Sequence, residues 1–190
     1  MAQVEDRGIK FLVDEMHNKL CVWLRLLGYD AKGSKDYEVK YGPSVADKNL
    51  IVEALEEGRV LLTGDKQMFE IITDKAQRQN KQLTYKNTNI PHAVKIRQDV
   101  PENQLIALHK VIPLEYNLNF DAMCCTDCGG KNVKVENKED VRGKVVDGVF
   151  NDVDQFWKCS KCGKVFWVGS QTKNIVASFD KMMELLKESN

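Results

Sequence analysis

The sequence has no excess of charge of either sign and no long apolar run. Lys and Arg together number 28, as do Asp and Glu, so net charge provides no general attraction to nucleic acid or membranes, and any polyanion site has to be local. The first ten residues are largely polar, and no run approaches the roughly 18 apolar residues of a membrane span. We therefore expect no signal peptide, no membrane contact and a cytoplasmic or otherwise intracellular, reducing compartment.

The cysteines lack the scattered, even spacing that is typical of a secreted disulfide scaffold. Four of the six form two Cys-x-x-Cys pairs, each followed by a glycine: Cys125, Cys128, Cys159 and Cys162. Two such turns supply the four thiolates of a tetrahedral site and leave no position for water, so we predict a structural zinc ribbon. Redox dithiols, buried free cysteines and an iron–sulfur cluster are the alternatives. Cys124 is interpreted as a bystander and Cys21 as a core residue.

Short apolar runs and helical spacing alternate in the first part of the chain. Strands are expected at residues 9–14, 29–31 and 59–65. Helices are expected at residues 16–28 and 44–58. Gly28 is predicted to close the first helix, and Ser44 is predicted to be the N-cap of the second. This alternation indicates βαβ units and a parallel sheet, and 43% hydrophobic residues suffice for a core.

The second part of the chain changes in composition after about residue 119. Before that point we expect helices at 68–79 and 104–112 and a strand at 93–97. After it, Gly, Lys, Asn and Asp become dense, and ribbon strands are expected within residues 133–136, 145–150, 155–159 and 166–169. Apolar spacing over 173–188 predicts a packing helix. We therefore predict an α/β domain at 1–120, a zinc ribbon at 121–172 and a C-terminal helix at 173–190.

Three aspartates occur where a parallel sheet would gather them at one edge. Asp14 and Asp65 each end a predicted strand, and Asp47 lies near the start of a predicted helix. Carboxylates are suitable ligands for Mg²⁺ or Mn²⁺, which activates water and offsets charge on a phosphodiester. Basic side chains close to them in the sequence are candidates for substrate phosphate contacts: Lys19, Arg25 and Lys66. Helix capping by the aspartates and a solvated helix face for the cations are the alternatives.

Three segments of the sequence carry a resemblance to a known family. They read FLVDEMHNKLCVWLRLLGYDA (11–31), DKNLIVEALEEGRVLLTGDK (47–66) and CTDCGG with FWKCSKCGKVFWVGS (125–130 and 156–170). In this order they resemble the Mut-seven C-terminal ribonuclease domain family, a PIN-like nuclease domain followed by a zinc ribbon. The resemblance runs over roughly residues 9–172. It implies a PIN-like three-layer α/β/α fold with a central parallel sheet, and cleavage of RNA that depends on a divalent metal.

The resemblance also implies roles for individual residues. Asp14 would be the first metal-binding acid, Asp47 the acid at the head of the middle helix, and Asp65 the acid of a T-x-D motif. Lys19 and Arg25 would contact phosphate, and Asp30 would be a structural acid.

The chain departs from the family pattern at three points. Gly64 stands where the family usually has a basic residue, and Gln171 stands where it has a histidine. A fourth acid has no clear match, although Glu15 and Asp99 are candidates.

The function expected from these features is that of a metal-dependent ribonuclease whose ribbon also contacts RNA. Ribbon cations and aromatic side chains are the candidates for that contact: Lys131, Lys134, Arg142, Lys144, Lys158, Lys161 and Lys164, with Phe156, Trp157, Phe166 and Trp167. The aromatic residues are alternatively the ribbon's own core. A catalytically inactive RNA-binding or adaptor module, or a protein partner docked on helix 173–188, are the other functions considered. The RNA class, the mode of cutting and the oligomeric state are left open.

Overall fold

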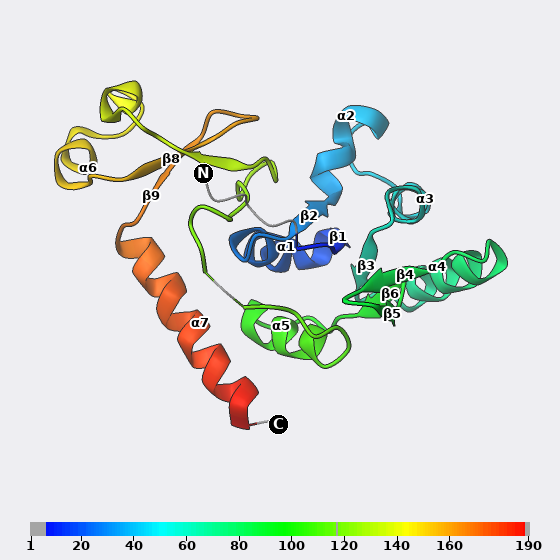
Figure 1. Ribbon diagram of the computed structural model, residues 1–190. Coiled ribbons are helices and arrows are strands. Elements are labelled where there is room, and N and C mark those ends of the chain that lie inside the picture. The colour runs from blue at the N-terminus through cyan, green and yellow to red at the C-terminus, as the bar shows by residue number, and fades with distance from the viewer. Residues whose placement is uncertain (1–6, 117, 189–190) are drawn as a thin grey trace.

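The computed structural model describes residues 7–116 and 118–188 (Figure 1). Residues 1–6 and 189–190 of the predicted domains lie outside the described residues, as does the side chain of Gln171. Within the described ranges, no helix is both long enough and apolar enough to cross a membrane.

Four parallel strands form a central sheet in the order β2-β1-β3-β6. They are β1 (Lys10–Val13), β2 (Asp30–Gly33), β3 (Val60–Thr63) and β6 (Ala93–Lys95). Every side chain of the central strand β3 is buried, as its unbroken apolar sequence requires of a strand covered on both faces. The predicted parallel sheet is therefore confirmed.

Helices cover both faces of this sheet (Figure 1). They are α1 (Asn18–Leu26), α3 (Asp47–Glu57), α4 (Lys66–Arg78) and α5 (Pro101–His109), and α7 (Ser170–Glu188) packs against α5. Because successive side chains of a strand point to opposite faces, Phe11 and Val13 join a core with α1, α5 and α7, whereas Leu12 joins a second core with α3 and α4. The domain thus has three layers, with the sheet in the middle.

Short elements that the sequence did not predict connect these layers. They are η1 (Glu15–His17), η2 (Ser34–Tyr37), α2 (Glu38–Tyr41) and an antiparallel pair, β4 (Leu83–Tyr85) and β5 (Thr88–Ile90).

Two local predictions are wrong. Ser44 does not cap α3, because its backbone has a left-handed φ of 58° and the helix begins at Asp47 after Ala46. Residues 145–150 were predicted as a ribbon strand, but helix α6 (Asp147–Asp152) begins within them. The helical turn brings Val149, Phe150 and Val153 together on the small core of the ribbon, which an extended chain would not do.

The ribbon is an antiparallel sheet of three strands with its own core. Its elements are β7 (Asn132–Lys134), η3 (Lys138–Val141), β8 (Phe156–Cys159) and β9 (Val165–Trp167), with β8 in the middle. Four buried side chains form the core: Val141, Phe150, Phe156 and Val165.

Helix α7 follows the ribbon in sequence but completes the core of the α/β domain. Phe179, Met182 and Leu186 are buried in the same cluster as the sheet residues, and the Phe179 ring lies 4.6 Å from that of Trp23 on α1. The helix is therefore the packing element that its apolar spacing predicted.

Candidate metal centres and active site

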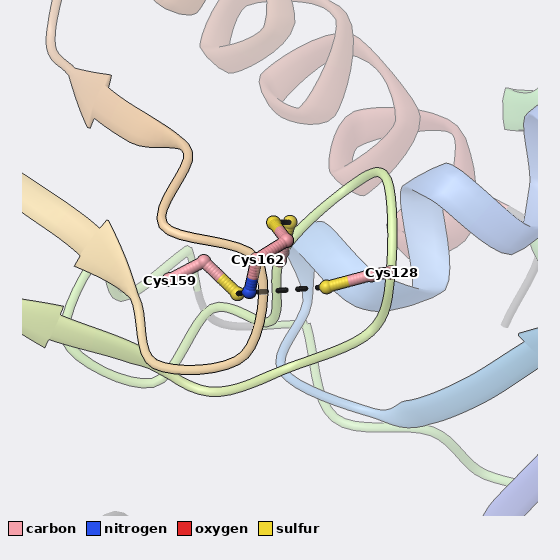
Figure 2. A group of neighbouring side chains, drawn as sticks. Cys128, Cys159 and Cys162 are labelled. Atoms are coloured by element: carbon pink, nitrogen blue, oxygen red, sulfur yellow. Dashed lines mark hydrogen bonds between the residues drawn. The ribbon is translucent and has the colours of Figure 1, made fainter. Parts of the chain in front are cut away.

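The four predicted zinc ligands converge on one point from two turns of the ribbon. Figure 2 shows Cys128 opposite Cys159 and Cys162, and the Sγ atoms of the four cysteines all lie within 4.8 Å of one another. The Sγ of Cys125 is 3.7 Å from that of Cys162, and the Sγ of Cys128 is 3.5 Å from that of Cys159. Sulfurs about 2.3 Å from one tetrahedral zinc lie at about this spacing. The donor set therefore fits zinc.

The backbone of each turn is shaped around the sulfurs. A Cβ on Gly130 would lie 2.8 Å from the Sγ of Cys159 and equally close to the Cβ of Lys161, so this position has room only for glycine. The glycines predicted to close the turns, Gly129 and Gly163, have φ values of 66° and 77°. The amides of Lys161 and the residue after it point at the Cys159 sulfur, at 3.4 and 3.5 Å, and favour its thiolate.

The other two cysteines lie outside this cluster. Cys21 is 3% exposed, and burial raises the pKa of its thiol to about 11, which leaves it protonated and unreactive. Cys124 pairs in an isolated bridge with Lys131, and burial likewise raises its pKa to about 11.

The predicted acids occupy the carboxyl ends of the central strands, and one hydroxyl connects two of them. Asp14 follows β1 and is buried, whereas Asp65 follows β3 and is exposed. The buried Thr63 donates its hydroxyl to Asp14 Oδ2 at 2.8 Å and accepts the amide of Asp65 at 3.0 Å. Asp65 also caps α4, where its Oδ1 accepts the amide of Met68 at 2.7 Å. Thr63 thus fixes the orientation of the Asp14 carboxylate next to the turn that carries Asp65.

Asp47, the first residue of α3, lies within the electric field of the other two. Although Asp47 is exposed, partial desolvation raises the pKa of its carboxyl, and the negative charges of Asp14 and Asp65 raise it further. The three carboxylates are nevertheless more widely spaced than the cysteines. Among the described residues, only the cysteine cluster brings three or more His, Cys, Asp or Glu ligand atoms within 4.8 Å of one another.

This arrangement suits a hydrated ion better than a dehydrated one. Hard divalent cations such as Mg²⁺ take oxygen ligands, retain several waters and are often held through one or two carboxylates. In such a site Asp14 would be the oriented ligand, and Asp47 and Asp65 would contribute charge.

A histidine that the sequence analysis overlooked lies beneath the same edge. His17 is 2% exposed, and its Nδ1 accepts a hydrogen bond from Gln104 Nε2 at 3.0 Å. The same amide donates to the carbonyl of Arg97 at 3.0 Å, which places the proton of a neutral imidazole on Nε2. That nitrogen makes no hydrogen bond of normal geometry in the described part of the chain, although the Ile96 carbonyl still favours the protonated ring. The position of His17 three residues after Asp14 was the only signal in the sequence.

The backbone at residue 64 lies close to this imidazole. A Cβ on Gly64 would lie 3.2 Å from Nε2 of His17 and 3.1 Å from the carbonyl oxygen of Ile96, so a side chain there would require a small shift of these neighbours. Burial lowers the pKa of His17, although the nearby Asp14 carboxylate and the Ile96 carbonyl oppose the shift. The neutral ring therefore packs under the turn between Thr63 and Asp65.

The Mut7-C RNAse domain family model matches residues 9–179. The chain belongs to this family. A search of curated proteins and a search of solved structures found no match. Membership indicates a nuclease-like role, and it confirms the family that the three sequence segments suggested.

Two of the predicted phosphate-binding cations of this Mut7-C domain are exposed. Lys19 lies on α1 with no ion pair to any described residue, and Lys66 opens α4 directly after Asp65. Lys66 makes only a loose contact with Glu70, at 3.6 Å. Arg97, just beyond the carboxyl end of β6, is a further exposed cation, which the sequence analysis missed.

Arg25 has a structural role, which corrects the predicted phosphate contact. Its side chain is 5% exposed, and Nη2 forms an ion pair with Asp36 at 2.6 Å. Nε donates to the carbonyl of Ala31 in β2 at 2.8 Å, and Nη1 donates to the carbonyl of Thr126 in the ribbon at 2.9 Å. Arg25 thus connects the first zinc turn to the edge strand of the sheet and is not available to substrate.

The remaining acidic candidates are placed as follows. Asp30 forms a two-pronged ion pair with the buried Arg59, at 2.8 and 3.0 Å, in line with its interpretation as a structural acid. Glu15 is exposed, and Asp99 is engaged by Val100 and Asn103 at the start of α5. Neither contributes to the pKa shift of Asp47, so a fourth active-site acid stays unassigned.

Proposed function

We propose that this chain is a divalent-metal-dependent ribonuclease, with a PIN-like α/β/α domain that hydrolyses RNA phosphodiesters at the edge formed by Asp14, Asp47 and Asp65. The observation that carries the proposal is the buried Asp14 carboxylate, which the Thr63 hydroxyl orients at 2.8 Å next to the turn that carries Asp65. The raised pKa of Asp47, caused by desolvation and then by the charges of Asp14 and Asp65, supports it. No described cation forms an ion pair with any of the three acids. Uncompensated negative charge at a strand edge favours a bound cation.

Each residue at this edge has a distinct part in the proposed reaction. A Mg²⁺ or Mn²⁺ ion held by Asp14, with Asp47 and Asp65 beside it, would lower the pKa of a bound water and offset charge on the phosphate. Thr63 orients Asp14 through its hydroxyl. Lys19 and Lys66, both exposed, are positioned to attract flanking phosphates.

The zinc ribbon has a structural part in this proposal. Four thiolates complete the coordination of zinc, so Cys125, Cys128, Cys159 and Cys162 would leave no open position for substrate or water. Zinc would therefore stabilise the ribbon, and the chemistry belongs to the aspartates.

The second candidate function is that of an inactive RNA-binding or adaptor module. The wide spacing of the three carboxylates favours it, because a shared cation would have to be bridged through water. A protein partner on helix 173–188 has less support, since Phe179, Met182 and Leu186 of α7 are already buried in the domain.

A cleavage assay decides between these functions. Labelled single-stranded RNA is incubated with Mn²⁺ and the zinc-loaded protein, and the parent is compared with Asp14→Asn and Asp65→Asn. We expect each variant to lose activity on the order of 100-fold or more, as when a group that stabilises transition-state charge is removed. Asp74→Asn, on the exposed side of α4, is the matched control and should cleave like the parent. RNA bound by the parent but not cleaved would support the adaptor instead.

A further inference from the structure

Four lysines of the ribbon line one shallow hollow. The hollow has a volume of about 820 Å³ and lies over β7, the start of the second zinc turn and the segment after η3. We call it the lysine hollow after its four cations: Lys134, Lys144, Lys158 and Lys161. Glu136 and Asp140 also line it, so positive charge exceeds negative charge there by two, in a chain whose net charge is zero.

The structure distinguishes these four from two other cations of the ribbon, Arg142 and Lys164. Arg142 donates two hydrogen bonds to the carboxylate of Glu139, and Lys164 is bound by both oxygens of Asp127 at 2.7 and 2.8 Å. Their charges are therefore already compensated. The lysines of the hollow differ from them in this respect.

The hollow lysines are exposed and lack such partners. Lys134, Lys158 and Lys161 form no ion pair with any residue in the described ranges. Lys144 donates to the carbonyl of Asp140 at 2.7 Å and keeps its full charge. Three unpaired ammonium groups and a fourth held by a neutral carbonyl are well suited to successive phosphates of a flexible strand.

The hollow lacks aromatic stacking surfaces. Phe156 and Trp157 are buried in the protein, and the indole of Trp157 is bound to Asp121 at 2.7 Å. Phe166 and Trp167 line a separate apolar pocket beside α1 and α7. Since bases are held by stacking or by their edges and phosphates by cations, the hollow is suited to the strand's backbone and not to its sequence.

We propose that the lysine hollow is a binding site for the phosphate backbone of a single RNA strand, separate from the acidic edge. This proposal rests on the proposed function in taking RNA as the substrate. It assigns RNA binding to the ribbon and RNA cleavage to the sheet edge, so mutations can abolish either activity without the other.

The test measures binding and not cleavage, in an Asp14→Asn background that keeps the RNA intact. Fluorescence anisotropy gives the affinity for a labelled single-stranded RNA across a salt series. With Lys134, Lys144, Lys158 and Lys161 all changed to Gln, we expect the slope of log affinity against log salt to fall by about 2.8, which is about 0.7 for each lost contact. Relative to 1 M salt, this corresponds at 0.1 M salt to binding that is weaker by roughly 600-fold.

A control variant removes the same charge from exposed lysines elsewhere: Lys75, Lys110, Lys173 and Lys181, each changed to Gln. It should keep the parent's slope, because the slope reports phosphate contacts and none of these four lysines lines the hollow, whereas an effect of net charge alone would lower the slope equally in both variants. An equal fall in both variants would overturn the proposal, as would no fall in the hollow variant.

Zinc content is measured for each variant, because Cys159 also borders the hollow. If the fourfold variant loses zinc, the double variant Lys134→Gln/Lys144→Gln replaces it, because it leaves the second zinc turn unchanged. Its expected slope change is about 1.4. An unchanged slope in that variant overturns the proposal. Failure of the nuclease proposal is seen separately, as absence of cleavage by the parent.

Discussion

The two ends of the central sheet differ in whether their carboxylates form ion pairs. At the amino ends of β2 and β3, Asp30 and Glu57 are matched by the buried Arg59 and by Lys32, with contacts of 2.6 to 2.8 Å. At the carboxyl ends, three aspartates have no ion-pair partner in the part of the chain that the structure describes. The same sheet therefore carries one neutralised cluster and one cluster with unbalanced charge.

The pKa values record this difference. Burial opposes the charge of Glu57, but hydrogen bonds from Lys32 and Arg59 outweigh it and bring its pKa from 4.5 down to about 2. For Asp47 partial desolvation and the neighbouring charges act in the same direction, and its pKa rises. The amino end gains stability from its charges, whereas the carboxyl end keeps unbalanced negative charge.

The largest loss of stability is expected from removing Arg59, which pairs with the carboxylates at the amino end of the sheet. Arg59→Met removes a buried guanidinium and leaves Asp30 and Glu57 without it, so the free energy of unfolding should fall by about 3–5 kcal/mol. Arg78→Met is the matched control. Arg78 is exposed and only loosely paired with Asp74, so its loss should change stability by less than about 1 kcal/mol. Urea denaturation of zinc-loaded protein gives both values, and equal losses would contradict the contrast between the two ends.

Acid should erase the contribution of Glu57. A carboxylate with a lowered pKa in the folded state stabilises the protein above its ordinary pKa and loses that contribution as pH falls. From the two pKa values, the window runs from 4.5 down to about 2. At pH 7 we expect Glu57→Gln to be about 2–3 kcal/mol less stable than the parent, with the gap closing through this window. Glu56→Gln, on the exposed side of α3, should show no such gap, and a pH-independent gap for Glu57→Gln would refute the assignment.

Features that depend on residues close together in the chain could be predicted from the sequence. The zinc ligands were predictable because a Cys-x-x-Cys turn is a local signal, and the sheet was predictable because strand and helix periodicities are local as well. Asp14 and Asp65 followed from one further rule, that parallel strands end at a common edge.

Contacts between segments far apart in the chain were not predictable in this way. Arg25 was interpreted as a phosphate ligand because its charge is visible in the sequence, whereas its partners in β2 and in the ribbon are not. His17 and Gln104 lie 87 positions apart, so no local pattern connects them. Helix α6 was missed because its apolar residues are equally compatible with a strand over so short a segment.

A divalent cation should stabilise the unbalanced end. A ligand that binds only the folded state at 100 times its dissociation constant adds about 2.7 kcal/mol, which is visible as a rise in melting temperature. We expect Mn²⁺ to raise the melting temperature of the zinc-loaded parent and to have much less effect on Asp14→Asn. Thr63→Val, which removes the hydroxyl that orients Asp14, should weaken the Mn²⁺ effect by roughly 10- to 100-fold in concentration, and Thr63→Ser should preserve it. Equal shifts in all four proteins would place the ion elsewhere.

The smallest expected effect on stability comes from the repulsion between Asp47 and the other two carboxylates. Replacing Asp47 by Asn relieves repulsion from Asp14 and Asp65 but also removes a negative charge from the first turn of α3, where the helix dipole favours it. The single variant therefore has no clear sign, and a double-mutant cycle is needed. Without divalent metal, Asp47→Asn should be less favourable by about 0.5 kcal/mol when Asp14 is already Asn, because the repulsion it would relieve is gone. Adding Mn²⁺ should reverse the sign of this coupling, since the parent's two carboxylates then share a cation. A coupling energy that is the same with and without the metal would mean that Asp14 and Asp47 do not belong to one site.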